Sequence, residues 1–157
     1  MVKVAFQGER GAFSEDAATK LFGGGIDFLH CVGLKGVFEL VSQDEVEFGV
    51  VPLENSQAGS INETYDLLLA YTLNIFAEVI LKVSHCLMAL PGEKLADITT
   101  IYSHPQALAQ CAEFLSKLNV EIMPSYDTAG SAKMIKEKKL KNCAAIASKR
   151  AADIYGL

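Results

Sequence analysis

Residues 2–22 read VKVAFQGERGAFSEDAATKLF, and this one stretch contains the pattern that repeats along the chain. It starts with an apolar run at 2–6, continues through small and polar residues at 7–14, and ends in an amphipathic pattern from about 15 to 22. A short apolar run favours a strand, whereas a period near 3.6 residues favours a helix. The stretch therefore predicts a strand, a polar turn and a helix with Ser14 as its N-cap.

The same order of strand, polar turn and helix recurs after this first copy, which is typical of the α/β class. A capping box of Ser60 and Glu63 is expected at the helix that starts near Ile61. The apolar run 75–90 predicts one long strand, or a pair, crossing between two lobes. Further strands are predicted at 26–31, 48–52, 100–102, 120–123 and 144–147, and helices at 34–42, 61–70, from about 107 to 118, after Thr128 and after Ser148.

Composition and charge limit the class of partner. The chain has 157 residues, half of them hydrophobic, and a net charge of −5. Scattered basic residues argue against a nucleic-acid groove or an anionic membrane surface, so a small molecule is the expected ligand. Gly8 comes too early for the apolar part of a signal peptide, and no run of about eighteen apolar residues follows. We expect a soluble, cytosolic protein.

No cofactor or metal is expected. Cys31, Cys86, Cys111 and Cys143 form no C-x-x-C pair, so the pattern favours buried free thiols over a zinc or redox site. Glycines 8 and 11 lack the middle glycine of a dinucleotide fingerprint.

Polar turns after the strands are the candidate binding elements. In open α/β sheets, ligands bind outside the carboxyl ends of the strands, where helix N-termini present free N–H groups. Four turns fit this description, at 8–14, 54–60, 103–106 and 127–131. Arg10, one of only two arginines, is either a carboxylate contact or an exposed loop residue. Glu54 directly follows an apolar run, where partial burial would raise the pKa of its carboxyl; the alternative is a solvated loop acid.

Each of these residues also has an ordinary structural interpretation. Asn55, Ser56, Ser103 and Asp127 could be helix caps. His104 precedes a proline and is expected to be extended and partly exposed. His30 and His85 lie in apolar strands and are better explained as sheet or core residues than as catalysts.

Together these segments resemble the prephenate dehydratase family across almost the entire chain. The resemblance rests on GERGAFS at 8–14, VPLENSQAGS at 51–60 with DLL at 66–68, SHPQALAQ at 103–110, DTA at 127–129, and AAIASKRAADIYGL at 144–157. It implies an α/β fold of two lobes, similar to type II periplasmic binding proteins, with the active site in the cleft between them. Residues 1–78 would form the first lobe, 79–150 the second, and 151–157 the start of a return to the first.

The resemblance also implies a reaction and a set of site residues. Family members convert prephenate to phenylpyruvate, with loss of water and carbon dioxide and without a cofactor or metal. The family pattern implies roles in the reaction for Glu54, Asn55 and Gln106, with Asn55 and Gln106 also contacting the substrate. Substrate contacts are further expected from Arg10, Ser14, Ser56, Ser60, Ser103, His104, Asp127 and Thr128.

The resemblance departs at the C-terminal end. Family members continue past YGL with a strand and a Thr-Arg-Phe segment that holds the main catalytic hydroxyl, and then with a regulatory module that binds phenylalanine. If the chain ends at Leu157, it lacks these parts and is expected to be impaired as an enzyme. A non-catalytic module that binds a small anion therefore stays open as an alternative. Arogenate dehydratase is a second alternative, because the motifs do not distinguish the two substrates. Association into a homo-oligomer is also expected.

Overall fold

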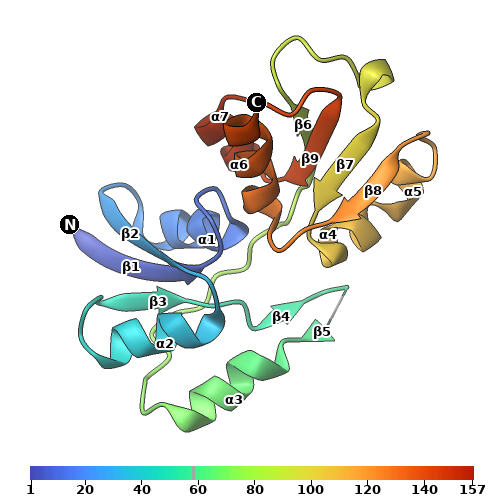
Figure 1. The fold of residues 1–157 in the computed structure, drawn as a ribbon. Helices are drawn as coiled ribbons and strands as arrows, with labels where there is room; N and C mark the ends of the chain where they lie inside the picture. The colour runs from blue at the N-terminus through green and yellow to red at the C-terminus, as the bar shows by residue number, and fades with distance from the viewer. Residues whose placement is uncertain (58) are drawn as a thin grey trace. The chain divides into compact units, whose positions relative to one another are not determined.

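In the computed structural model, which describes residues 1–57 and 59–157, the chain forms two compact units. The first unit comprises Met1–Glu9 and Phe13–Lys82, and the second comprises Arg10–Ala12 and Val83–Leu157. Each unit combines β-sheet with helices (Figure 1). The predicted α/β class is confirmed in both.

The first unit is built on a parallel sheet with the strand order β2-β1-β3. Because the strands are parallel, their carboxyl ends lie at the same edge. A two-stranded antiparallel hairpin, β4-β5, follows β3. The elements of this unit are β1 (Val2–Gln7), α1 (Phe13–Phe22), β2 (Ile26–Cys31), α2 (Leu34–Ser42), β3 (Phe48–Val50), β4 (Glu54–Asn55), β5 (Gly59–Ser60) and α3 (Asn62–Ala70).

Close packing of α2 on the sheet forms the core of the first unit. Ala5 of β1 and Val37 of α2 are buried there together with Val46. A Cβ atom on Gly49 would lie 2.7 Å from Cγ1 of Val37, so glycine lets the helix approach β3 directly. The ring of Phe48 packs against that of Phe22, with centroids 4.8 Å apart.

The second unit is built on a four-stranded sheet with the order β6-β9-β7-β8. β7 is parallel to both β8 and β9, whereas β6 is antiparallel to β9. The elements of this unit are β6 (Cys86–Ala89), a 3₁₀ turn (Leu95–Asp97), β7 (Thr100–Ser103), α4 (Pro105–Gln110), α5 (Ala112–Leu115), β8 (Glu121–Pro124), α6 (Thr128–Lys138), β9 (Cys143–Ala147) and α7 (Lys149–Tyr155).

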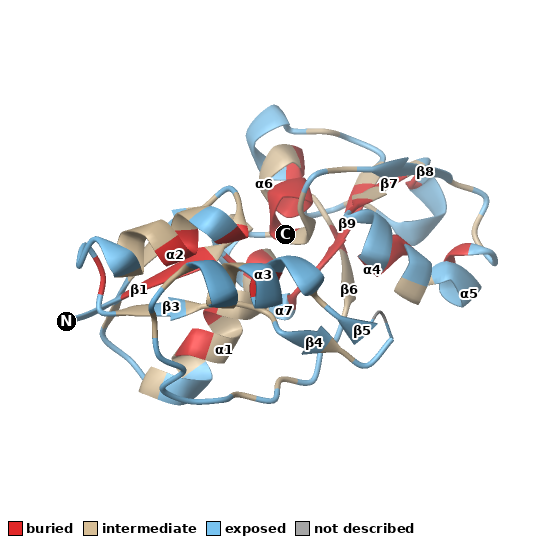
Figure 2. Cartoon of the chain, turned by 90° about the horizontal axis from the view of Figure 1, so that it is seen from below, coloured by how far each residue is buried: buried red, intermediate tan, exposed pale blue. Residues whose placement is uncertain are grey.

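Strand β9 supplies core residues to both faces of this sheet, and Figure 2 shows it as largely buried. Ala145 and Ala147 pack with residues of α6 and α7, whereas Ala144 and Ile146 pack with residues of α4 and α5. This alternation follows from the two-residue period of a strand. A central strand covered by helices on both faces explains why 143–147 is a continuous apolar run.

The prediction of a strand across 75–90 is largely wrong. Only Cys86–Ala89 forms a ladder, and residues 72–85 contain no strand. A strand requires a hydrogen-bonding neighbour, and no strand among residues 1–57 and 59–157 pairs with residues 72–85. Phe76 instead packs its ring on Phe48, with centroids 5.2 Å apart.

Three helix boundaries also differ from the prediction. Ser14 is the second residue of α1 and does not precede the helix. Ile61, not Ser60, is the N-cap of α3 and makes no side-chain cap, so the capping box with Glu63 is wrong. The predicted helix up to 118 is two short helices that separate at Cys111.

The boundaries of the two units differ from those of the expected lobes. The first unit extends to Lys82, whereas the expected first lobe ended at residue 78. Residues 10–12 belong with the second unit, and α7 contacts α6 there. The chain therefore leaves the first unit at Glu9 and re-enters it at Phe13.

Candidate functional site

Two of the predicted polar turns lie together at one edge of the second sheet. Strands β7, β8 and β9 run in the same direction, so the segments that follow them start at the same edge. The backbone N–H of Ser125, after β8, donates a 2.8 Å hydrogen bond to the carbonyl oxygen of Ser103, the last residue of β7. This bond joins the turn at 103–106 to the segment that leads into the turn at 127–131.

Ser103 is fully buried and already has a hydrogen-bond acceptor. Its hydroxyl donates a 2.6 Å bond to the carbonyl oxygen of Ile146 in the neighbouring strand β9. Since a serine hydroxyl has one proton, Ser103 in this state could contact a ligand only as an acceptor. The alternative interpretation of Ser103 as a helix cap is wrong, because His104 is the cap of α4.

His104 and Gln106 are exposed at the start of α4. His104 is extended, with φ −63° and ψ 141°, as expected before a proline. Its Nδ1 accepts a 3.2 Å hydrogen bond from the backbone N–H of Gln106. His104 therefore has a capping function at Nδ1.

Asp127 caps α6, as its alternative interpretation predicted. Its Oδ1 accepts a 2.6 Å hydrogen bond from the backbone N–H of Gly130. Beside the cap, the hydroxyls of Ser125 and Ser131 are 2.5 Å apart. Thr128 is the first residue of the helix and is partly buried. The carboxylate thus complements the helix dipole at this turn.

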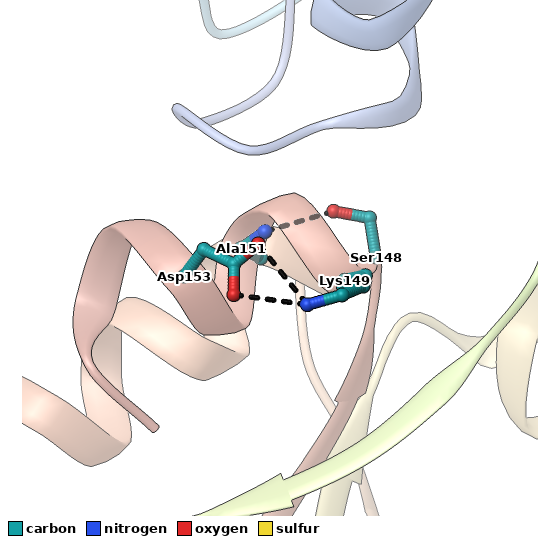
Figure 3. A network of polar contacts seen from close by, with 4 residues as sticks. All are labelled: Ser148, Lys149, Ala151 and Asp153. Carbon is teal, nitrogen blue, oxygen red and sulfur yellow. Dashed lines mark hydrogen bonds and ion pairs between the residues drawn. The ribbon is translucent and has the colours of Figure 1, made fainter.

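The turn that carries Arg10 is bound to helix α7. The hydroxyl of Ser148 donates a 2.5 Å hydrogen bond to the carbonyl oxygen of Gly11 and accepts a 3.0 Å bond from the backbone N–H of Ala151. Figure 3 shows the second of these bonds next to the exposed ion pair of Lys149 and Asp153. The hydroxyl of Tyr155 donates a 2.9 Å bond to the carbonyl oxygen of Arg10.

The hairpin β4-β5 holds the predicted acid Glu54 in the first unit. Glu54 is exposed, so the expected partial burial is not found, and its Oε1 accepts a 3.2 Å hydrogen bond from the hydroxyl of Tyr65. Partial loss of hydration raises the pKa of the Tyr65 phenol, and the hydrogen bond to Glu54 raises it further, although 38% of the residue is exposed. The Oδ1 of Asn55 accepts a 2.9 Å bond from the backbone N–H of Gln57, which forms a local turn and not a helix cap.

The remaining predicted residues of this unit are Ser14, Ser56 and Ser60. Ser56 and Ser60 are exposed in and after the hairpin turn, whose residue Ala58 lies outside the described residues. Ser14 is partly buried near the start of α1. The predicted site residues are thus divided between the units: Ser14, Glu54, Asn55, Ser56 and Ser60 belong to the first, and Arg10, Ser103, His104, Gln106, Asp127 and Thr128 to the second.

Sequence patterns did not single out Tyr65, Thr64 or Tyr155. Tyr65 and Thr64 lie next to the DLL segment, and Tyr155 lies in the YGL segment, so only the resemblance covered this part of the chain. Tyr65 donates a hydrogen bond to Glu54, and Thr64 donates one to Pro52. Tyr155 donates one to Arg10. None of these acceptors lies within the local turn of its donor.

The cysteines and the possible metal-binding side chains can be described for most of the chain. Within residues 1–57 and 59–157, no three His, Cys, Asp or Glu side chains are grouped as a metal site would require. Buried free thiols were expected, and all four cysteines are free but only partly buried. Burial raises the pKa of the Cys31 and Cys111 thiols, which keeps them protonated and weakly nucleophilic at neutral pH.

None of the helices in the described part of the chain has the length and apolar character needed to cross a membrane.

Several known proteins are similar to this chain. A family model described as prephenate dehydratase matches residues 4–157. An Arabidopsis thaliana protein named arogenate dehydratase/prephenate dehydratase 2, chloroplastic, is 47% identical over 156 residues, covering 99% of this chain and 41% of that protein. Arogenate dehydratase 2 of Petunia hybrida is 46% identical and is covered over 39% of its length.

Solved structures show the same similarity. The prephenate dehydratase of Arthrobacter aurescens, solved in complex with L-Phe, has a TM-score of 0.89 and 30% identity over 98% of this chain and 52% of that chain. A structure described as GqqA, a novel type of quorum quenching acylase, has a TM-score of 0.89 and 34% identity over 98% of this chain and 56% of that chain. The chain spans about two fifths of the length of the plant relatives and about half of these solved chains.

Proposed function

Because the chain belongs to the prephenate dehydratase family, we propose that it provides substrate-binding and catalytic residues for the conversion of prephenate to phenylpyruvate. The observation that carries the proposal is the match to residues 4–157, which includes every polar turn at a strand's carboxyl end. The fold agrees with this function, since such turns supply the neutral donors that a dianionic substrate needs.

The proposed reaction requires one proton and no oxidant or reductant. Breaking the bond between the ring and its carboxylate releases carbon dioxide, and that electron pair enters the ring as the bond to the hydroxyl breaks. The hydroxyl takes up a proton and leaves as water, and the ring becomes aromatic. The protein must therefore donate a proton or a strong hydrogen bond to the leaving oxygen and hold the two carboxylates.

We assign these tasks to residues whose positions are compatible with them. Glu54 is the candidate residue for orienting the site or for proton transfer, and its Oε1 accepts a hydrogen bond from the hydroxyl of Tyr65. Gln106 is exposed at the start of α4, where its side-chain amide could donate to a carboxylate. The Oδ1 of Asn55 accepts a hydrogen bond within its turn, and the side-chain NH2 is the donor group proposed for the substrate. The other binding contacts proposed are Arg10, Ser14, Ser56, Ser60, Ser103, His104, Asp127 and Thr128.

Arogenate is the second candidate substrate. Several plant relatives are named arogenate dehydratases, including the Petunia hybrida protein that is 46% identical. Arogenate has an amino acid side chain where prephenate has a keto acid, so the two substrates differ in one positive charge. Comparison of kcat/KM for the two substrates distinguishes them.

The experiment that tests the proposal is the measurement of phenylpyruvate formation by its absorbance in alkali. Prephenate and arogenate are each supplied to this chain and to the protein in its natural full length, with phenylalanine as the product measured from arogenate. Turnover by either form supports a dehydratase. If both forms bind prephenate without turnover, the non-catalytic binding module is favoured. If both forms show no binding and no turnover, the proposal is overturned.

Three further expectations belong to the same proposal. The two units are proposed to act as the lobes of a fold similar to type II periplasmic binding proteins, with the substrate between them. A homo-oligomer is expected, and light scattering of the purified protein tests it. A cytosolic location stays a prediction, since plant relatives are named as chloroplastic.

A further inference from the structure

One face of α7 binds the peptide that carries Arg10. Ser148 and Tyr155 are seven residues apart, so their side chains lie on the same side of the helix, two turns from each other. Each donates its hydroxyl proton to one carbonyl oxygen of this peptide, at 2.5 Å to Gly11 and at 2.9 Å to Arg10. Two consecutive peptide groups are therefore held by side chains 137 and 145 residues away in the chain.

Between these two hydrogen bonds, Gly11 packs directly against Ala151. A Cβ atom on Gly11 would lie 2.7 Å from Cα and 2.9 Å from Cβ of Ala151, which leaves room only for a glycine. Gly11 also has φ +91°, a backbone conformation that other residues rarely adopt. Gly11, Ala151 and Ser148 are all buried, whereas Arg10 is exposed. The backbone of this turn is thus fixed on α7 while the side chain of Arg10 extends to the surface.

We propose that Ser148 and Tyr155 are positioning residues that hold Arg10 for contact with a carboxylate of the substrate. This inference rests on the proposed dehydratase function. The chain enters this turn from the first unit at Glu9 and returns to it at Phe13, so these hydrogen bonds attach Arg10 to the second unit. A guanidinium recognises a carboxylate through two parallel hydrogen bonds, and that geometry requires a fixed backbone.

The test separates positioning from a purely structural role. Arg10→Ala removes the guanidinium but keeps the backbone carbonyl that Tyr155 binds, so Tyr155→Phe and Arg10→Ala can be combined in a cycle. In the natural full-length protein, Tyr155→Phe is expected to raise KM roughly three- to tenfold, with kcat within about twofold of the unsubstituted enzyme. In the Arg10→Ala background, Tyr155→Phe should raise KM no further.

The matched control lies on the same helix. Asp153→Asn breaks the exposed ion pair with Lys149 without contacting the Arg10 turn, so KM should not change. Equal increases in KM from Tyr155→Phe with and without Arg10 would overturn the proposal, as would no increase when Arg10 is present.

A second measurement does not depend on turnover. Hydrogen exchange at residues 10–12 and at the amide of Ala151 should be faster in Ser148→Ala and unchanged in Asp153→Asn. If the unsubstituted protein turns over neither prephenate nor arogenate, the proposed function fails and the positioning role fails with it, whereas exchange still reports the attachment to α7. Unchanged exchange in Ser148→Ala contradicts the attachment itself.

Discussion

The hydroxyl of Thr64 in α3 donates a 2.7 Å hydrogen bond to the carbonyl oxygen of Pro52. Thr64 is fully buried, and Pro52 lies two residues before Glu54, which is proposed to orient the site or take part in proton transfer. The helix that follows the hairpin therefore holds the segment that precedes it.

Replacing Thr64 with valine tests this bond with little change in shape. The variant leaves the Pro52 carbonyl without its donor, so the free energy of unfolding should fall by about 1–3 kcal/mol. Urea unfolding measures the change. Thr72→Val is the control, because Thr72 is exposed, and it should shift stability by less than about 0.5 kcal/mol. Equal shifts for the two variants would contradict a structural role of the bond.

Asp127 should stabilise α6 as a cap, independently of any contact with substrate. Asp127→Ala removes the acceptor for the Gly130 N–H and should lower the free energy of unfolding by about 1 kcal/mol. Asp127→Asn should retain most of that stability, since asparagine caps about as well as aspartate. A loss of kcat/KM in Asp127→Asn with stability preserved would show that the charge also serves the reaction.

Gly11 and Gly23 form a matched pair that separates backbone strain from steric conflict. Both have positive φ, +91° and +78°, but only Gly11 lies against another residue, Ala151. Gly23→Ala should cost about 1 kcal/mol from strain, and Gly11→Ala should cost about 1–3 kcal/mol more from overpacking. Thermal or urea unfolding of both variants measures the difference. Similar losses would mean that the turn moves away from α7 without cost.

Alkaline pH should weaken the fold in part through Tyr65. The pKa of this phenol is raised above 10.0 in the folded protein, so the folded state keeps its proton to higher pH than the unfolded state. Its contribution to stability is complete below pH about 10 and is lost as the pH rises from there through the folded pKa. The urea midpoint should therefore fall less between pH 9 and 11 in Tyr65→Phe than in the unsubstituted protein.

Glu54→Gln provides the partner test for the same bond. Removing the carboxylate lowers the pKa of the Tyr65 phenol towards its ordinary value, because both the hydrogen bond and the negative charge of Glu54 raise it. Absorbance titration of the phenol, taken as the difference from Tyr65→Phe, measures this shift. An unchanged titration would exclude the bond between Tyr65 and Glu54 in solution.

Elements with local boundary signals were predicted well. The strand Ile26–Cys31 and the helix Leu34–Ser42 agree with the sequence prediction at both ends. Gly23, Gly24 and Gly25 mark the start of the first, and a helical period marks the second. The run 75–90 was mispredicted because an apolar segment looks the same whether or not a neighbouring strand pairs with it.

The candidate site shows the same division between local and distant contacts. Asp127 was recognised from sequence as a possible cap, since a cap joins a side chain to an N–H only a few residues ahead. Ser103 was expected at a helix start, but its hydroxyl donates to Ile146, 43 residues away. Glu54 was expected to be partly buried, but the hairpin leaves it exposed.

The amino-acid sequence was sufficient for the α/β order, the family and the cap at Asp127, because each depends on residue types at short spacing. The folded chain was needed to show which carbonyl oxygens the hydroxyls of Ser103, Ser148 and Thr64 bind, and why residue 11 must be glycine. The physical reason is that a hydroxyl donates to the nearest suitably oriented acceptor. When donor and acceptor are far apart in sequence, the packing of helices and strands decides which acceptor is nearest.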